Sequence, residues 1–153
     1  EFADFECPGC AALHPEMAAF IAEREDILLV FKNHPLPSHP NAMLAAKATV
    51  CAHQQGKFWE LSDAIFDNQR TLQTSNSEVA AMDFLDFLVG PRQLDLDRVA
   101  WQSCMDDEAT VANVEDDLAS AEQMGVNATP SLFLHGVCEA GGCCVVGERG
   151  YNW

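Results

Sequence analysis

The N-terminal part of the chain alternates between short apolar runs and a stretch of helical period. Residues 1–5 have the pattern of the end of a strand, and a helix is predicted over residues 8–24, with Pro8 suited to its first turn. Pro15 lies inside this helix, so we expect a kink or a break there. Residues 27–32 are apolar, with β-branched and aromatic side chains, which predicts a buried strand. The order strand, helix, strand is typical of a parallel unit.

The middle of the chain is a block of helical patterns that follows a proline-rich loop over residues 33–40. Apolar periodicity predicts helices over residues 41–53, 57–68, 75–89, 95–105 and 107–124. Ser75 and Glu78 have the spacing of a capping box at the start of the third of these helices, and Gly90 ends it. Gly125 is the predicted stop of the last helix.

Two short apolar segments complete the pattern. Residues 131–134 and 145–146 predict two strands that pair as an antiparallel hairpin. A block of helices inserted between a strand–helix–strand unit and a hairpin is typical of an α/β fold with a small mixed sheet. The length of 153 residues suits a single domain that buries a sizeable core.

The composition excludes several classes of function. Hydrophobic residues make up 48% of the chain and charged residues 21%, as in a globular domain. The net charge of −16 repels nucleic acid and anionic membranes, so we expect neither as a partner. The longest dense apolar run, residues 27–31, is too short to span a membrane. The seven cysteines favour an oxidising compartment, and their odd number leaves at least one thiol unpaired in a monomer.

The segment Cys7-Pro8-Gly9-Cys10 carries the clearest chemistry. It lies where the first strand ends and the first helix begins, so the Cys7 sulfur is expected at the helix N-terminus, where backbone amides and the helix dipole stabilise a thiolate. Cys10 lies one turn further along, close enough to form a small disulfide ring. In thiol–disulfide exchange one thiolate attacks a disulfide sulfur, and the second thiol resolves the mixed disulfide. Such a pair needs no organic cofactor and no metal.

Several segments, taken in order, resemble a known family. They are residues 2–10 (FADFECPGC) with His14-Pro15, residues 31–37 (FKNHPLP) with 39–42 (HPNA), residues 55–60 (QGKFWE), and residues 125–131 (GVNATPS). Together they span nearly the whole chain and are similar to the DsbA-like thiol–disulfide oxidoreductases of the thioredoxin superfamily. The resemblance implies a thioredoxin-like fold whose core is formed by residues 1–39 and 125–153, with a helical insertion over residues 40–124.

The resemblance also assigns roles at the redox pair. It implies that Cys7 is the exposed nucleophile and Cys10 the resolving thiol. Thr129-Pro130 would form a cis-proline loop that packs against the pair, with the Thr129 backbone presented to an extended substrate peptide. Pro8 and Gly9 would also contact substrate. They offer the Cys7 sulfur no side-chain donor, which favours a less oxidising pair than one with histidine at position 9.

The implied partners are protein dithiols and disulfides, with a quinone-linked membrane protein as the oxidant by family analogy. The expected location is extracytoplasmic, either periplasmic, secreted or tethered to a membrane, with the cytoplasm as the alternative. The reductase and isomerase directions of the same chemistry are alternatives to oxidation.

Two further cysteines, Cys51 and Cys104, lie in different predicted helices of the insertion. Related sequences often carry cysteines at such places, so the resemblance implies that these two form a structural disulfide. The alternative is two buried free thiols that pack as small hydrophobic groups.

A metal-binding or thiol-buffering module is the rival from another functional class. Cys7 and Cys10 would then form half of a zinc site, with the other ligands drawn from Cys138, Cys143 and Cys144. Those three do not form a second Cys-x-x-Cys, and neighbouring residues of a strand point to opposite faces. Zinc is therefore the weaker hypothesis, and the cysteine-rich hairpin stays without an assigned role.

The remaining polar residues near the motif favour structural interpretations. Asp4 and Glu6 flank the pair and could relay protons, but carboxylates are common throughout this acidic chain. His14 is expected to be structural, beside the helix kink. The other histidines considered, which show no ligand spacing and are expected at the surface or at caps, are His34, His39 and His53.

The family pattern begins its first strand earlier and adds a helix after Gly147. We therefore expect this chain to be truncated at both ends. Apolar side chains of residues 27–31 and 131–134 would then be left in water, and such patches drive association. A homodimer through that face, or marginal stability, is the expectation.

Overall fold

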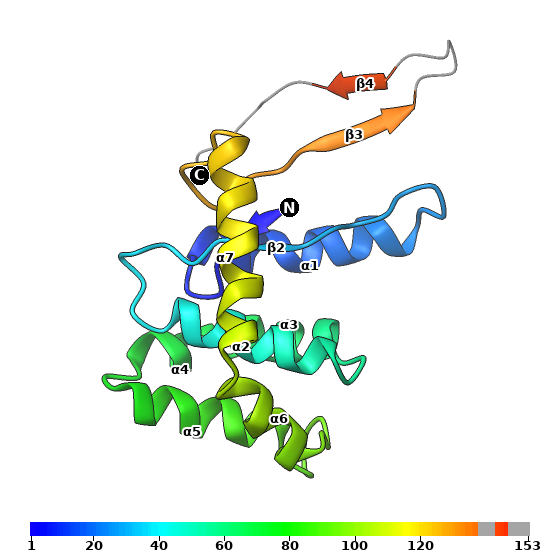
Figure 1. Ribbon diagram of the computed structural model, residues 1–153. Coiled ribbons are helices and arrows are strands. Elements are labelled where there is room, and N and C mark those ends of the chain that lie inside the picture. Colours follow the sequence, from blue (N-terminus) through cyan, green and yellow to red (C-terminus); the bar gives the residue numbers. More distant parts are fainter. Residues whose placement is uncertain (138–142, 147–153) are drawn as a thin grey trace.

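The computed structural model describes residues 1–137 and 143–146, with residues 135–137 and 143–146 described by their backbone alone. Cys138 and the segment from Gly147 onward lie outside the described residues. In chain order the elements are β1 (Phe2–Ala3), α1 (Pro8–Ala22), β2 (Lys32–Asn33), α2 (Ala42–His53), α3 (Phe58–Asp67), α4 (Gln69–Thr74), α5 (Glu78–Val89), α6 (Arg98–Met105), α7 (Glu108–Gln123), β3 (Leu134–Val137) and β4 (Cys143–Val146), as Figure 1 shows. None of the described helices is long and apolar enough to cross a membrane.

The strand–helix–strand unit is confirmed, but its second strand is shorter than predicted. β1 and β2 pair in parallel, with Phe2 opposite Lys32, and α1 connects them. The predicted buried strand over residues 27–32 is wrong for all but its last residue, and Leu28 is 86% exposed and Val30 54% exposed. These residues have no strand to pair with in the described part of the chain, because β1 contains only Phe2 and Ala3 and pairs with Lys32 and Asn33.

The C-terminal strands form the predicted antiparallel hairpin, with Leu134 of β3 opposite Val146 of β4. The first of them begins later than expected, since residues 131–133 are not in a strand. A single antiparallel bridge from Phe2 to Ser131 links the hairpin segment to β1. Figure 1 shows the hairpin extending away from the helices at one end of the molecule. The described strands thus form two two-stranded sheets rather than one mixed sheet.

The helical block has one more helix than the sequence pattern predicted, because the separate short helix α4 follows α3. The predicted capping box at Ser75 is wrong. Ser75 follows the end of α4, and it is Ser77 whose side chain accepts a hydrogen bond from the backbone amide of Ala80 at the start of α5. The predicted break at Pro15 is also absent, since α1 continues through this residue. Gly125 ends α7 with a positive φ of 70°, as a helix stop requires.

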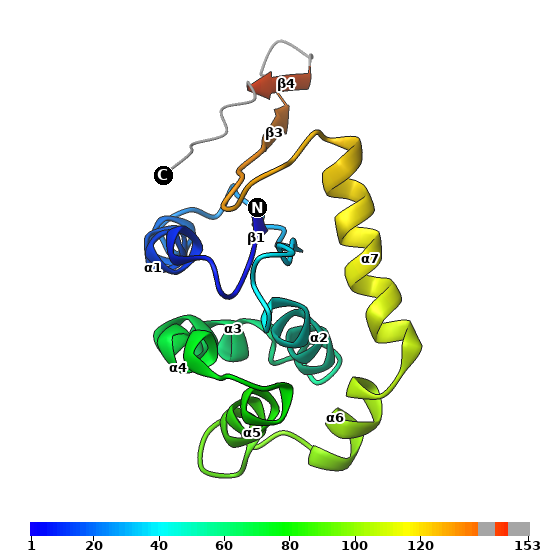
Figure 2. The same ribbon diagram turned by 90° about the vertical axis from the view of Figure 1, so that its left-hand side faces the viewer.

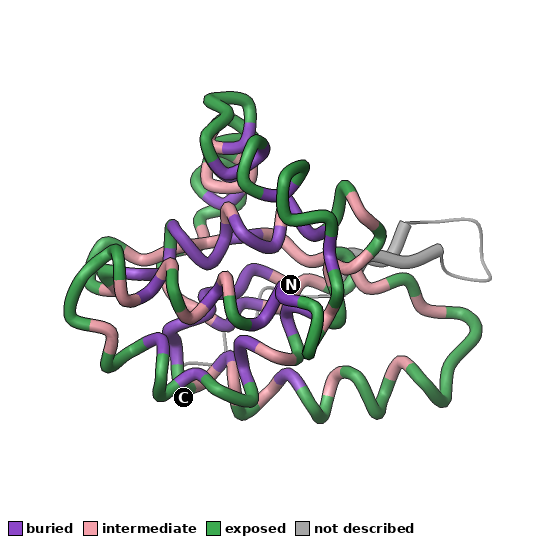
Figure 3. The backbone as a smooth tube through the Cα atoms, turned by 90° about the horizontal axis from the view of Figure 1, so that it is seen from below, coloured by how far each residue is buried: buried purple, intermediate pink, exposed green. Residues whose placement is uncertain are grey.

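The core lies where the strand unit meets the helical block. Its largest fully buried side chains include Trp101, Phe5, Leu61, Ile65, Leu72 and Leu85, and the buried residues are purple in Figure 3. In Figure 2, α1 and α7 lie on opposite sides of β1. Asp117 holds α7 on its side of β1 and β2. Its carboxylate pairs with the Lys32 side chain at 2.8 Å and accepts from the Asn33 amide at 2.9 Å. The fold class is therefore α/β with a helical insertion, as predicted.

A disulfide joins two helices of this insertion. Cys51 of α2 and Cys104 of α6 are bonded to one another, and both are buried. The adjacent Thr110 hydroxyl donates to the Cys104 carbonyl at 2.6 Å. The bond closes a loop between residues separated by 53 positions in sequence, so it restricts the unfolded chain strongly.

We predict that replacing both cysteines, in a Cys51→Ala/Cys104→Ala variant, lowers the free energy of unfolding by about 4 kcal/mol, because the unfolded chain regains the entropy of the open loop. Urea unfolding of the wild type and the variant under non-reducing conditions measures the difference. Equal midpoints with equal slopes would contradict this structural role.

Candidate active site

Cys7 occupies the position just before α1, with an extended backbone at φ −76° and ψ 120°. Pro8 follows at the start of the helix, and no acidic residue lies in its first turn. The positive end of the helix dipole is therefore left free to act on the Cys7 sulfur. Both cysteines are free thiols, and Cys10 is fully buried. The expectation that Cys7 is exposed is wrong, since Cys7 is buried with 8% of its surface exposed, because the residue Thr129 lies against its sulfur.

The two thiols differ sharply in acidity. Hydrogen bonding from the Cys10 thiol, supported by the Thr129 side chain and by the backbone amides of Cys10 and Gly9, lowers the pKa of Cys7 to about 5 against the opposing effect of burial. The same Cys7–Cys10 hydrogen bond and burial raise the pKa of Cys10 above its usual range. At neutral pH Cys7 is thus a thiolate and Cys10 a thiol that supports it.

The loop of residues 129–130 covers the pair. The Thr129–Pro130 peptide bond is cis, and in the thiol form Cys7 donates from Sγ to the Thr129 carbonyl at 3.3 Å. A Cβ added at Gly9 would lie 3.0 Å from Pro130 Cδ, so a side chain at position 9 would press on the Pro130 ring, which would have to shift slightly. Thr129 Oγ1 is buried and has no hydrogen-bond partner among the described residues. A hydroxyl so placed can donate to the Cys7 thiolate.

The carboxylates beside the motif are buried and committed to structural hydrogen bonds. Asp4 accepts from the backbone amides of Glu6 and Leu36, each at 2.7 Å, and from His39 Nδ1 at 2.7 Å. Glu6 accepts from the backbone amide of Asn41 at 2.6 Å. The alternative that these two residues relay protons gains no support, because their carboxylate oxygens accept hydrogen bonds from the surrounding loops. The expectation that His39 is only a surface or capping group is wrong, since it pairs with buried Asp4.

The other histidines lie outside the pair. His14 Nε2 lies 2.6 Å from Asp63 Oδ1, and its ring packs on Phe66 with centroids 4.6 Å apart, so its described contacts are structural. His34 is part of the connection after β2, where burial lowers the pKa of its ring. His53 is exposed at the end of α2.

Sequence analysis missed two residues that contact the backbone of the motif. Gln69 and Gln73 of α4 donate amide hydrogens to carbonyls of residues 5–7. Nothing in the sequence marks these glutamines, because they belong to a helix that its periodicity did not separate from α3. Their contacts bring the helical insertion directly to the redox pair.

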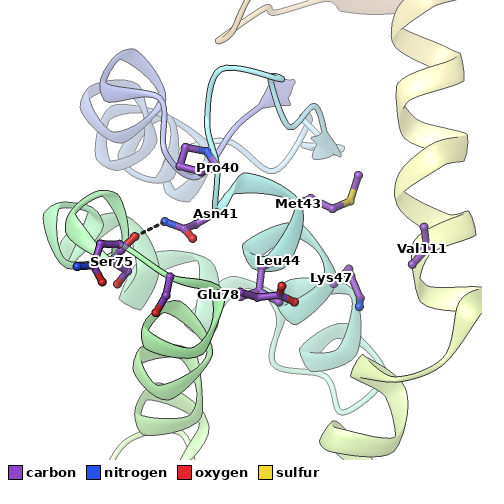
Figure 4. Close-up of a pocket in the computed structure, with 10 residues that line it drawn as sticks. Pro40, Asn41, Met43, Leu44, Lys47, Ser75, Glu78 and Val111 are labelled. Carbon is purple, nitrogen blue, oxygen red and sulfur yellow. Dashed lines mark hydrogen bonds between the residues drawn. The ribbon is translucent and has the colours of Figure 1, made fainter.

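A surface pocket of about 480 Å³ lies between α2, the connection before α5, and α7. It is lined by Pro40, Asn41, Met43, Leu44, Lys47, Ser75, Asn76, Ser77, Glu78 and Val111, most of which Figure 4 labels. Neither cysteine of the pair lines it. Within the described residues no cluster of three or more His, Cys, Asp or Glu side chains is arranged to hold a metal ion. The zinc hypothesis also needs ligands from Cys138, Cys143 and Cys144. Cys138 lies outside the described residues, and the side chains of Cys143 and Cys144 are not described.

The family model described as Thioredoxin matches residues 1–139. The chain belongs to this family. DsbA2 from Pseudomonas aeruginosa is 26% identical and superposes with a TM-score of 0.67 over 87% of this chain and 70% of that one. A thioredoxin-like oxidoreductase from Silicibacter pomeroyi is also 26% identical, with a TM-score of 0.63 over 86% and 69%. The chain is therefore a DsbA-like member of the thioredoxin superfamily, as its motifs predicted.

Curated relatives of similar sequence have a different name. The Na⁺/H⁺ antiporter NhaA 1 of Mycolicibacterium vanbaalenii is 34% identical over 146 residues, which are 92% of this chain and 22% of that protein. The Na⁺/H⁺ antiporter NhaA of Herminiimonas arsenicoxydans is 34% identical over 137 residues, covering 89% and 20%. This DsbA-like chain thus spans about a fifth of the length of these relatives.

We predict that alkylation of the reduced chain follows the ionisation of one thiol with an apparent pKa of about 5, and that mass spectrometry finds the label on Cys7. In Cys10→Ala the pKa of Cys7 rises toward its ordinary value, because the strongest hydrogen bond to the thiolate is lost. Labelling of Cys10 ahead of Cys7 at neutral pH would reverse the assignment.

Proposed function

We propose that this chain is a thiol–disulfide oxidoreductase that exchanges disulfides with protein substrates through Cys7 and Cys10. The observation that carries the proposal is the position of the free Cys7 thiol at the N-terminus of α1, with the fully buried Cys10 thiol one turn behind it. Cys7 is the less enclosed of the two, with 8% of its surface exposed against none for Cys10, so a partner that opens the site meets Cys7 first. Family membership and the DsbA structures support the same chemistry.

The proposed reaction starts from the disulfide form of the pair. A substrate thiolate attacks Cys7 Sγ, the Cys7–Cys10 bond breaks, and Cys10 leaves with the electron pair and takes up a proton. A second substrate thiolate then attacks the substrate sulfur of the mixed disulfide and releases the Cys7 thiolate. The substrate loses two electrons as its disulfide forms, and the cysteine pair gains them. Reduction of a substrate disulfide is the same sequence in reverse.

The acidity of Cys7 supports the oxidising direction. A thiolate is present in the reduced pair and absent from the disulfide, so whatever stabilises it favours transfer of the disulfide to substrate. The Cys10 thiol, and the Thr129 hydroxyl that is placed to donate to the thiolate, supply the donors that the side chain at position 9 lacks. The buried Cys51–Cys104 disulfide supports an extracytoplasmic location, because such bonds persist in oxidising compartments. Regeneration by a membrane redox partner belongs to this proposal.

Substrate binding is proposed at the surface beside the pair. Residues 1–39 and 125–153 would form the thioredoxin-like core, which brings the Thr129 backbone next to Cys7. An extended peptide that pairs with this backbone places its sulfur at Cys7 and contacts Pro8 and Gly9. Residues 40–124 form the insertion behind the pair. Ion transport, which the relatives' names describe, is not part of the function proposed for this chain.

Single-cysteine variants test the exchange reaction. The oxidised wild type is expected to convert a two-cysteine peptide to its disulfide, and Cys7→Ser to abolish this, because the attacked sulfur is gone. Reduced Cys10→Ser, mixed with a disulfide-containing peptide, should instead accumulate a mixed disulfide through Cys7, since no resolving thiol remains. Chromatography measures the oxidation of the peptide, and mass spectrometry detects the mixed disulfide.

The Cys51→Ala/Cys104→Ala variant is the control, and it should still oxidise the peptide because that disulfide lies within the helical insertion. Peptide oxidation by Cys7→Ser at the wild-type rate would refute the proposed function.

A further inference from the structure

We propose that Gln69 and Gln73 are positioning residues that hold the turn before the redox pair, so that the Cys7 sulfur stays against the N-terminus of α1. The inference rests on the proposed function for its biological meaning, but it concerns the geometry of Cys7 alone. Neither glutamine touches the sulfur in the described contacts. Both act on the backbone that carries it.

The two side chains satisfy three successive carbonyls. Gln69 Nε2 donates to the carbonyls of Phe5 and Cys7, each at 2.9 Å. Gln73 Nε2 donates to the carbonyl of Glu6 at 2.7 Å and to Gln69 Oε1 at 3.2 Å. The second contact orients the Gln69 amide so that its nitrogen faces the turn. One turn of α4 therefore supplies donors to every carbonyl from residue 5 to residue 7.

Burial makes the two carbonyl bonds of Gln69 costly to lose. Gln69 is 9% exposed, and its bonds to Phe5 and Cys7 lie in a buried environment. Without Gln69 the buried Phe5 carbonyl loses its donor, so the turn would rearrange to find water or another donor. The Cys7 carbonyl also accepts the amide of Ala11 at 3.2 Å in the first turn of α1. Movement of this carbonyl thus moves the start of the helix.

The position of the sulfur follows from the same turn. The Cys7 amide donates to the Asp4 carbonyl at 3.1 Å, which closes the turn on its other side. Gln69 bridges the carbonyls on both sides of Glu6, so a rotation of the peptide planes between Phe5 and Cys7 would break at least one of its two hydrogen bonds. This keeps the Cys7 sulfur over the amides of the first turn. Without the bridge the sulfur can leave those amides, and the thiolate loses its support.

The helix that carries the glutamines is itself anchored. Asn41 Nδ2 donates to the carbonyls of Leu72 at 2.9 Å and Ser75 at 3.1 Å, and Figure 4 shows the Asn41–Ser75 contact. The backbone amide of Asn41 meanwhile donates to the Glu6 carboxylate at 2.6 Å. Leu72 is fully buried in the core. The helical insertion and the turn are thus linked by two independent sets of contacts, so α4 is a fixed support.

The test compares Gln69→Leu and Gln73→Leu with a matched control, Gln55→Leu. Gln55 also bridges backbone groups, accepting from the Asp97 amide at 2.8 Å and donating to its carbonyl at 3.2 Å, but at the start of α6. The readout is the pH dependence of Cys7 alkylation in the reduced chain, with circular dichroism to establish folding. This readout does not move with a general loss of stability.

Gln69→Leu is expected to raise the pKa of Cys7 by at least about one unit, which slows alkylation below pH 5 about tenfold. Gln73→Leu should raise the pKa of Cys7 by less, because this variant removes one hydrogen bond to a carbonyl rather than two. Gln55→Leu should leave the profile unchanged. If Gln69→Leu does not fold, Gln73→Leu decides the matter. A folded variant whose profile matches that of Gln55→Leu overturns the inference.

Failure of this inference is distinct from failure of the proposed function. A wild type that cannot oxidise a dithiol peptide, together with a shifted alkylation profile in Gln69→Leu, refutes the function and supports the positioning role. An active wild type with no shift in either glutamine variant refutes the positioning role and leaves the function standing.

Discussion

The Cys7 sulfur lies where the unpaired amides at the start of α1 point, and the rest of the site depends on this placement. The Cys10 thiol and the backbone amides of Gly9 and Cys10 stabilise the Cys7 thiolate and lower the pKa of Cys7, and the Thr129 hydroxyl is placed to donate to the same atom. Burial opposes them, because it disfavours any charge. The thiolate therefore exists only while these donors stay in position, and the surrounding structure holds them there.

Burial also separates the roles of the two cysteines. Cys10 is fully enclosed on the inner side of α1, where the backbone amide of Asp4 donates to its sulfur at 3.4 Å. Cys7 faces the loop of Thr129 and Pro130 and is the less enclosed of the two sulfurs. A partner that reaches the pair meets Cys7 first. The order of bond formation in the proposed reaction thus follows from position as well as from acidity.

The sequence predicted the motif and most helices because both depend on local spacing. Cys7 falls at a strand-to-helix junction whatever the tertiary structure is, and α7 has a clear apolar stripe that ends at Gly125. The strand predicted over residues 27–31 is wrong, because an apolar run shows only hydrophobicity, while a strand also needs a neighbouring strand to pair with. Ser75 and Ser77 are both acceptable caps, and only the end of α4 decides between them.

The turn before the motif could not be predicted for a different reason. Its carbonyls are satisfied from Gln69 and Gln73, more than sixty positions away in sequence. Such contacts have no period and no spacing rule, since they arise only when α4 packs against the strand unit. The same holds for Asp4 and His39, whose pairing follows from the path of the loop after β2.

The reduction potential of the Cys7–Cys10 pair, measured in a glutathione buffer, tests the central claim most directly. A stabilised Cys7 thiolate favours the reduced pair at neutral pH, so the account predicts a potential above about −200 mV, on the oxidising side of the glutathione couple. A potential near that of a reducing thioredoxin, about −270 mV, would contradict it.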